Sequence, residues 1–187
     1  MNSTSITPFS RSLVAALAVA LVLASGCGKR SPGEHGTTTG QSGTPGAIGT
    51  SAPPYALADL EGKVVKNTDF LGKVVILDFW ATWCPPCKAE IPHLIALQDK
   101  YKDQGLQIVG LSVDEGGAND VKPFANENKI NYTMLIASSE TARAYGGISG
   151  IPTTFVLDKR GTIVKKFLGY TDPDVFEAAI QPLLAAN

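Results

Sequence analysis

The sequence is poor in cysteine and histidine, and neither residue type is spread along the chain. It has three cysteines and two histidines in 187 residues. A framework of structural disulfides needs several cysteines distributed over the fold, and a closed structural zinc site needs four ligands. Cys27 stands alone, whereas Cys84 and Cys87 are separated by only two residues. The sequence therefore predicts neither a disulfide-stapled scaffold nor a metal site, and we expect no cofactor.

An excess of charge of one sign is also missing. The formal net charge is −1, and the charged residues, 18% of the chain, are scattered. Nucleic-acid binding needs concentrated Lys and Arg side chains that neutralise phosphates. We therefore predict no nucleic-acid partner. The apolar content of 44% is that of an ordinary globular protein, and the length suits one domain with accessory segments.

Long apolar runs are absent except for residues 13–24, an uncharged stretch of Leu, Val and Ala that follows Arg11 and Ser12. Twelve residues are too few to span a bilayer as a helix, but they suit the apolar core of a signal peptide. The run ends in Leu23-Ala24-Ser25-Gly26-Cys27, which resembles the lipobox of bacterial lipoproteins. The resemblance implies a signal peptide over residues 1–26, lipidation of Cys27 and anchoring at the periplasmic side of an envelope membrane. Simple cleavage that leaves Cys27 as a free thiol is the alternative.

Aromatic residues are absent from residues 28–54, where 19 of 27 residues are Gly, Ser, Thr or Pro. Such a segment cannot bury enough apolar surface to offset its chain entropy. We predict that residues 27–54 form a flexible, lipidated linker to a domain that begins at Tyr55.

From residue 55 to residue 187 the chain alternates between apolar β-branched runs and helical patterns. The run at residues 74–80 suits a buried central strand, and Pro85 suits the first turn of a helix. The alternation predicts an α/β domain with a central mixed sheet flanked by helices. We expect strands at residues 74–80, 106–113, 132–136, 153–157 and 162–167, and helices at residues 85–102, 120–128, 139–145 and 173–185.

Cys84 and Cys87 form the motif Trp83-Cys84-Pro85-Pro86-Cys87, directly after the first of these strands. Residues 75–88 resemble the active-site strand and helix of thioredoxins. Pro92 stands where thioredoxins carry a helix-kinking proline, and Gly150-Ile151-Pro152-Thr153 resembles their cis-proline loop. The resemblance implies a thioredoxin-like fold and thiol–disulfide exchange.

The region around residues 115–147 holds about one helix and one strand more than thioredoxin needs. Together with the envelope signal, this insertion resembles the TlpA/ResA-like branch of thiol–disulfide oxidoreductases. The resemblance implies protein thiol and disulfide substrates in the envelope and an upstream electron donor that the sequence does not identify. Many members of the branch are reductants, including those that prepare apocytochrome c for haem attachment.

Exchange requires a thiolate, and the start of a helix stabilises one at Cys84. We expect Cys84 to be the exposed nucleophile, and Cys87, one turn further, to be more buried and to resolve the mixed disulfide. Pro85 and Pro86 lack N–H groups, so only the Cys87 N–H remains to face the Cys84 sulfur. Weaker stabilisation of the thiolate favours the disulfide form, which makes the dithiol a better reductant.

Two acidic residues accompany the cysteines. Asp78 interrupts an apolar strand and matches the buried Asp of thioredoxins, which moves a proton to or from the resolving cysteine. Gly110 stands where thioredoxins often have a Lys, so burial should raise the pKa of Asp78 and suit it to act as a base. Glu90 matches a Glu of the ResA-like branch that tunes the pKa values of the cysteines. The alternatives are a strand-edge Asp that faces water and a solvated Glu paired with a Lys.

Five residues are predicted to contact substrate: Trp83, Pro85, Pro86, Ile151 and Pro152. The backbone at Pro152 would pair with an extended partner segment, and Trp83 would supply an exposed apolar contact. A peroxiredoxin-type peroxidase is one alternative, but it would need a Thr or Ser at Ala81 and a Pro at Leu77. A non-enzymatic copper chaperone is another, but it would need a wider cysteine spacing and a distal His.

Overall fold

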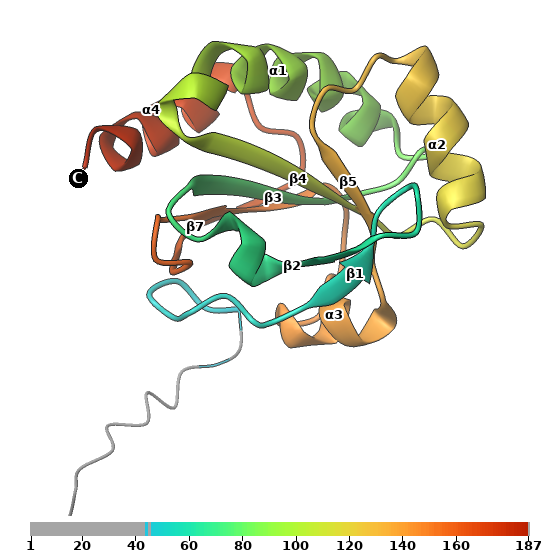
Figure 1. Ribbon diagram of the computed structural model, residues 1–187, viewed down its shortest axis with the longest axis horizontal. Coiled ribbons are helices and arrows are strands. Elements are labelled where there is room, and N and C mark those ends of the chain that lie inside the picture. Colours follow the sequence, from blue (N-terminus) through green and yellow to red (C-terminus); the bar gives the residue numbers. More distant parts are fainter. Residues whose placement is uncertain (1–43, 45, 187) are drawn as a thin grey trace, which may run out of the picture. The chain divides into compact units, whose positions relative to one another are not determined.

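The computed structural model describes residue 44 and residues 46–186, and its centre is a five-stranded mixed sheet (Figure 1). The strands are β3 (Val74–Trp80), β4 (Leu106–Ser112), β5 (Thr133–Ile136), β6 (Thr153–Leu157) and β7 (Ile163–Leu168). Their order across the sheet is β5-β4-β3-β6-β7. The central strand β3 runs parallel to β4 and antiparallel to β6. The predicted α/β class with a mixed sheet is confirmed.

Helices cover both faces of the sheet, as Figure 1 shows. Two of them, α1 (Pro85–Tyr101) and α4 (Pro173–Ala185), lie together on one face. On the opposite face lie α3 (Ser139–Ala144) and the antiparallel hairpin of β1 (Ala56–Ala58) and β2 (Val64–Lys66). The fourth helix, α2 (Ala118–Glu127), packs Val121 into a cluster with Trp80 and Ile91.

The alternation of side chains along β3 divides the core into two parts. Leu77 and Phe79 pack with Tyr145 and Phe155 on the face of α3. Ile76 packs with Leu94 of α1 and Phe176 of α4 on the other face. Because both faces are covered, every residue of β3 is buried, which explains its continuous apolar run.

The folded domain begins earlier than Tyr55. The Gly49 N–H donates to the Ile163 carbonyl at 2.7 Å, and the Ala52 N–H donates to the Gly161 carbonyl at 2.8 Å. Ala52 is buried, and Ser51 forms an isolated bridge with Thr162. The prediction of a flexible linker is therefore wrong for residues 46–54. Backbone hydrogen bonds attach this segment to the domain, although its side-chain composition gives no sign of ordered structure. The other residues of the linker apart from residue 44, the signal peptide and Cys27 lie outside the described residues.

The region between β4 and β6 contains α2, β5 and α3, and β5 extends the sheet by pairing parallel to β4. The hairpin β1–β2 and two 3₁₀ helices, at Asn67–Phe70 and Lys102–Gln104, were not predicted from the sequence. Within residues 46–186, no helix has the length and apolar character needed to cross a membrane.

Candidate active site

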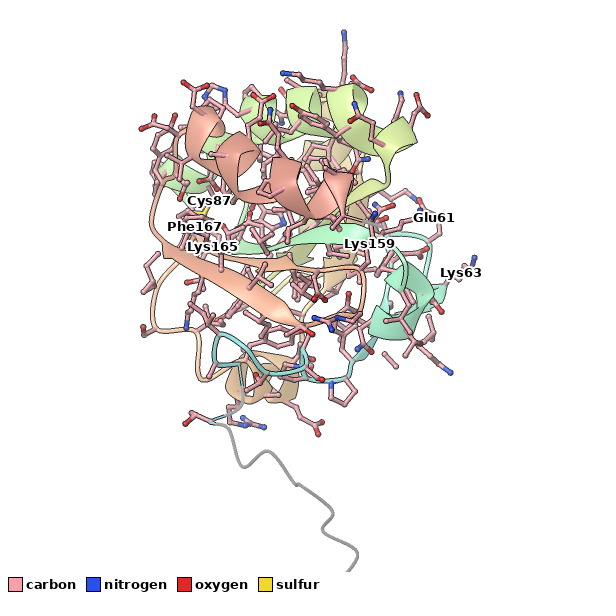
Figure 2. All side chains as sticks on the ribbon, turned by 90° about the vertical axis from the view of Figure 1, so that its left-hand side faces the viewer. Glu61, Lys63, Cys87, Lys159, Lys165 and Phe167 are labelled. Carbon is pink, nitrogen blue, oxygen red and sulfur yellow. A yellow bond between two sulfur atoms is a disulfide. The ribbon has the colours of Figure 1, made fainter. Side chains whose placement is uncertain are left out.

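Cys84 and Cys87 form a disulfide at the start of α1, with an S–S distance of 2.08 Å. β3 ends at Trp80, and a turn closed by the Cys84 N–H and the Ala81 carbonyl leads into the helix. Cys84 is the N-cap of α1, and the Cys87 N–H donates to its sulfur at 3.3 Å. Figure 2 shows the Cys87 sulfur beneath the helical layer. The Cys87 N–H, the donor that the proline pair leaves at this end of the helix, therefore faces the Cys84 sulfur.

The expected exposure of Cys84 is wrong for the disulfide form. Cys84 is 3% exposed and Cys87 is 1% exposed, so the two are almost equally covered. One cause is the loop opposite, because the Ile151 carbonyl oxygen lies 3.8 Å from the Cys84 sulfur. Trp83, by contrast, is 64% exposed, as predicted, and Pro85 and Pro86 are exposed too.

The loop opposite the disulfide contains a cis peptide bond between Ile151 and Pro152. Thr153 Oγ1 donates to the Gly150 carbonyl at 2.6 Å, and the Gly169 N–H donates to the Pro152 carbonyl at 2.9 Å. The first bond closes the loop on itself, and the second ties it to Gly169, the residue that follows β7. The structure thus brings the predicted substrate-contact residues together around one disulfide.

Asp78 is buried in the middle of β3, with an exposed fraction of 3%. Its neighbours across the sheet are Gly110 on β4 and Thr154 on β6, and Thr154 Oγ1 donates to Asp78 Oδ1 at 3.0 Å. Burial raises the pKa of Asp78 to about 7, although the Thr154 hydrogen bond opposes the shift. A Cβ on Gly110 would lie 2.5 Å from the Met134 sulfur, so a lysine at this position beside Asp78 would require the Met134 side chain to move.

Glu90 is fully buried on α1, one turn after Cys87, and is not a solvated helix residue. The Thr171 N–H donates to Glu90 Oε1 at 2.6 Å, while Oε2 has no partner within residues 46–186. Burial, and next the charge of Asp78, raise the pKa of Glu90 to about 8, although the Thr171 hydrogen bond lowers it. The structure therefore places two interacting carboxyl groups below the start of α1.

Asp114 is a site residue that the sequence analysis missed. It follows β4, and its carboxylate accepts hydrogen bonds from the Thr82 N–H at 3.1 Å, from Thr82 Oγ1 at 2.6 Å and from Ser112 Oγ at 2.7 Å. Thr82 lies in the turn that leads to Cys84. The available signal was topological: β3 and β4 are parallel, so the residues that follow them meet at one edge of the sheet.

Among the described residues, no group of three or more His, Cys, Asp or Glu side chains could hold a metal ion. A disulfide at a helix start, opposite a cis-proline loop on a mixed sheet, defines a thioredoxin-like thiol–disulfide oxidoreductase. The model of the AhpC/TSA family matches residues 48–166, and the chain belongs to this family. Within it, the sequence is of the TlpA/ResA-like type.

The chain is 35% identical over 136 residues to thiol-disulfide oxidoreductase ResA of Bacillus thuringiensis (strain Al Hakam), which covers 73% of this chain and 78% of the relative. ResA of Bacillus subtilis (strain 168) is 34% identical over 121 residues, or 65% of this chain and 67% of the relative. A crystal structure of a putative thiol:disulfide interchange protein DsbE from Chlorobium tepidum matches with a TM-score of 0.69 and 34% identity, over 74% of this chain and 99% of that one.

Proposed function

We propose that the protein is a lipid-anchored reductant of the bacterial envelope, which reduces disulfides in other envelope proteins. The observation that carries the direction of electron flow is the proline pair between the cysteines. It leaves the Cys87 N–H, 3.3 Å from the Cys84 sulfur, as the remaining donor in the first helical turn. A weakly stabilised thiolate favours the disulfide form and makes the dithiol a reductant.

In the proposed reaction the Cys84 thiolate attacks a substrate disulfide. A Cys84–substrate disulfide forms, and the first substrate sulfur leaves as a thiolate, which water protonates. Cys87 then loses its proton and attacks the Cys84 sulfur, which releases the second substrate thiolate. The substrate gains two electrons, the enzyme ends as the Cys84–Cys87 disulfide, and an envelope dithiol donor of unknown identity must reduce it again.

Asp78 is the proposed acceptor of the Cys87 proton. Its raised pKa of about 7 allows the carboxylate to take up and release a proton near neutral pH. Asp78 lies on the same face of β3 as Trp80, which packs in one cluster with Cys87. Glu90 tunes the site, because the two carboxyl groups disfavour simultaneous ionisation.

Lipid attachment at Cys27 would keep the domain at a membrane, where its partners lie. Membership of the ResA-like type makes apocytochrome c a candidate substrate in cytochrome c maturation. A Cys27→Ser variant should appear in the soluble envelope fraction, while the unaltered chain stays with the membrane.

Trapping tests the proposal as a whole. A Cys87→Ser variant should hold its partners as mixed disulfides through Cys84, and mass spectrometry of the trapped species identifies them. Trapping by Cys84→Ser instead would reverse the assigned roles. We expect a reduction potential nearer to that of thioredoxin, about −270 mV, than to that of strong envelope oxidants, about −120 mV. A value near the latter would contradict the reducing role.

A further inference from the structure

We propose that Gly46 and Pro53, at the two ends of the segment by which the chain enters the domain, are positioning residues of the active site. They hold Tyr145, the residue from which the cis-proline loop begins. Tyr145 is the C-cap of α3, and residues 146–150 connect it to the cis bond between Ile151 and Pro152. The inference rests on the proposed function, because it concerns how this loop is held for an extended substrate.

The segment between Gly46 and Pro53 has a fixed place on the sheet. It pairs with the start of β7, where the Ile163 N–H donates to the Thr50 carbonyl at 2.9 Å and the Gly49 N–H donates to the Ile163 carbonyl at 2.7 Å. β7 in turn pairs with β6, the strand that follows the cis-proline loop. A segment attached in this way can hold a neighbouring residue in place.

Two contacts join this segment to Tyr145. Gly46 is buried, and a Cβ at its position would lie 2.6 Å from the Tyr145 carbonyl carbon and 2.7 Å from the carbonyl oxygen. Any side chain at Gly46 would therefore clash with the Tyr145 backbone. At the other end of the segment, the Tyr145 hydroxyl donates to the Pro53 carbonyl at 3.2 Å. The segment thus holds both the backbone and the side chain of Tyr145.

The contact continues from Tyr145 to the disulfide. Ala52 and Tyr145 belong to one buried apolar cluster, and Ile148 and Ile151 of the loop pack against it. Ile151 packs also against the cluster that contains both cysteines, and its carbonyl oxygen lies 3.8 Å from the Cys84 sulfur. Because protein interiors are closely packed, a displacement of Tyr145 reaches the loop rather than being absorbed on the way.

The loop needs such support because its own sequence is permissive. Gly146 and Gly147 follow Tyr145 with φ values of 88° and 74°, and glycine has more conformational freedom than any other residue. The far end of the loop is held by the Gly169 N–H, which donates to the Pro152 carbonyl at 2.9 Å. Tyr145 holds the near end. A loop held at both ends loses less entropy when an extended segment pairs with its backbone.

Gly46 and Gly49 form a matched pair for a test. Both have positive φ values, 76° and 86°, so alanine strains the backbone at either position. Around a Cβ at Gly49, no atom of residues 46–186 lies within 4 Å except those of its chain neighbours. Gly46→Ala must displace Gly46 or Tyr145, and either movement ends their contact. Gly49→Ala introduces the strain alone.

A second pair removes a hydroxyl and leaves the ring. Tyr145→Phe deletes the donor to the Pro53 carbonyl. Tyr101→Phe is its control, because the Tyr101 hydroxyl accepts from Gln181 Nε2 at 3.1 Å, between α1 and α4 and away from the loop. This pair replaces the glycine pair if Gly46→Ala does not fold, as judged by circular dichroism.

The kinetic test uses the reduced full-length protein and two mixed disulfides of 5-thio-2-nitrobenzoate. One contains a short extended peptide, joined through its cysteine, and the other contains 2-mercaptoethanol, which is too small to pair with the loop. Stopped-flow absorbance of the released thiolate gives both rate constants. Gly46→Ala should react about fivefold more slowly with the peptide, the factor of one hydrogen bond, and at the unaltered rate with the small disulfide. Gly49→Ala should match the unaltered protein with both.

Amide hydrogen exchange measures the loop directly, without any substrate. The Gly169 amide, which donates to Pro152, should exchange about fivefold faster in Gly46→Ala than in Gly49→Ala. The Val74 amide, which donates to the Gly105 carbonyl at the start of β3, should exchange at the same rate in both variants. NMR spectra recorded after transfer to deuterated water give these rates.

Equal peptide rates and equal Gly169 exchange in the two glycine variants would overturn the positioning role and leave the proposed reductase activity standing. Equal slowing with both disulfides, or faster exchange at Gly169 and Val74 alike, would also overturn it, because the contact would then serve stability alone. If the unaltered protein reduced neither disulfide, the proposed function itself would fail, and the Gly169 exchange rates would still decide whether Gly46 holds the loop.

Discussion

The two faces of the central sheet are equally well buried but differ in what they bury. The face towards α3 receives Val75, Leu77 and Phe79 from β3, which pack in a cluster of buried apolar residues. The face towards α1 receives Asp78 from the same strand, and Glu90 is buried beside it. Neighbouring residues of one strand thus serve different ends: one face stabilises the fold, and the other carries ionisable groups beside the disulfide.

The two buried carboxyl groups lower the stability of the folded protein when they are ionised. Burial of a carboxyl group without a cation disfavours its charged form, and the pKa values of about 7 and about 8 for Asp78 and Glu90 record that cost. The apolar face must offset it. Substitutions on the two faces should therefore separate stability from activity, and four variants test this.

The largest loss of stability should come from the apolar face. Phe79 packs against Tyr145 and Phe155, with ring centroids 5.5 Å and 6.1 Å away. Phe79→Ala should lower the free energy of unfolding by about 3–5 kcal/mol, because it removes a buried ring and leaves a cavity. Urea unfolding of the oxidised protein measures the loss.

The reduction potential of folded Phe79→Ala should equal that of the unaltered protein, since the ring lies on the face opposite Asp78. A changed potential would show that the two faces are not separate. Phe79→Leu, which preserves most of the volume, should cost less than about 1.5 kcal/mol and serves as the milder member of the pair.

In contrast to Phe79→Ala, the Asp78→Asn variant should gain stability at high pH and lose activity. The pKa of Asp78 is raised from 3.8 to about 7, so the stability that its protonated form provides is full below pH 3.8 and is lost as pH rises to about 7. Asparagine does not ionise and can still accept from Thr154. The variant should therefore be more stable than the unaltered protein by about 2 kcal/mol at pH 8, and equally stable near pH 4.

The same variant should reduce disulfides about 100-fold more slowly at neutral pH, the effect expected when a positioned base is lost. Stopped-flow kinetics with a peptide disulfide measures the rate, and urea unfolding at the two pH values measures the stability. A variant that is more stable and equally fast would remove Asp78 from the mechanism and leave only its burial cost.

Glu90→Gln should produce a smaller gain. The pKa of Glu90 is raised from 4.5 to about 8, so the gain should develop as pH rises through that interval. It should reach about 1 kcal/mol, because glutamine weakens the bond from the Thr171 N–H that favours the ionised carboxylate. In Asp78→Asn the pKa of Glu90 should fall, since the charge of Asp78 is one of the causes that raise it. NMR titration of the Glu90 carboxyl carbon checks this shift.

The sequence was sufficient for the elements with strong local patterns. The apolar run of β3 and the proline that starts α1 locate the disulfide, and the cis-proline loop followed from resemblance. It was insufficient where backbone pairing decides the structure, as at residues 46–54. It also missed Thr171 and Asp114, which reach the site through contacts distant in sequence. It placed Cys84 at the surface because, although it predicted the cis-proline loop, it could not show how closely this loop approaches the Cys84 sulfur.

The smallest expected effect concerns Asp114 and Asp158. Each of these aspartates holds a turn by accepting hydrogen bonds, and the two turns lie at opposite ends of the domain. Asp114 holds the Thr82 turn beside the disulfide, and Asp158 holds the β6–β7 turn by accepting the Arg160 and Thr162 N–H groups at 2.9 Å. Each change to alanine should lower the free energy of unfolding by about 1 kcal/mol.

Only Asp114→Ala should slow thiol–disulfide exchange, because only its turn positions Trp83 and Cys84. Asp158→Ala removes comparable hydrogen bonds at the far end of β6 and should exchange at the unaltered rate. Stopped-flow rates at equal folded fraction compare the two. Equal slowing by both variants would assign the effect to general loosening of the fold, whereas slowing by Asp114→Ala alone makes that carboxylate a positioning residue of the site.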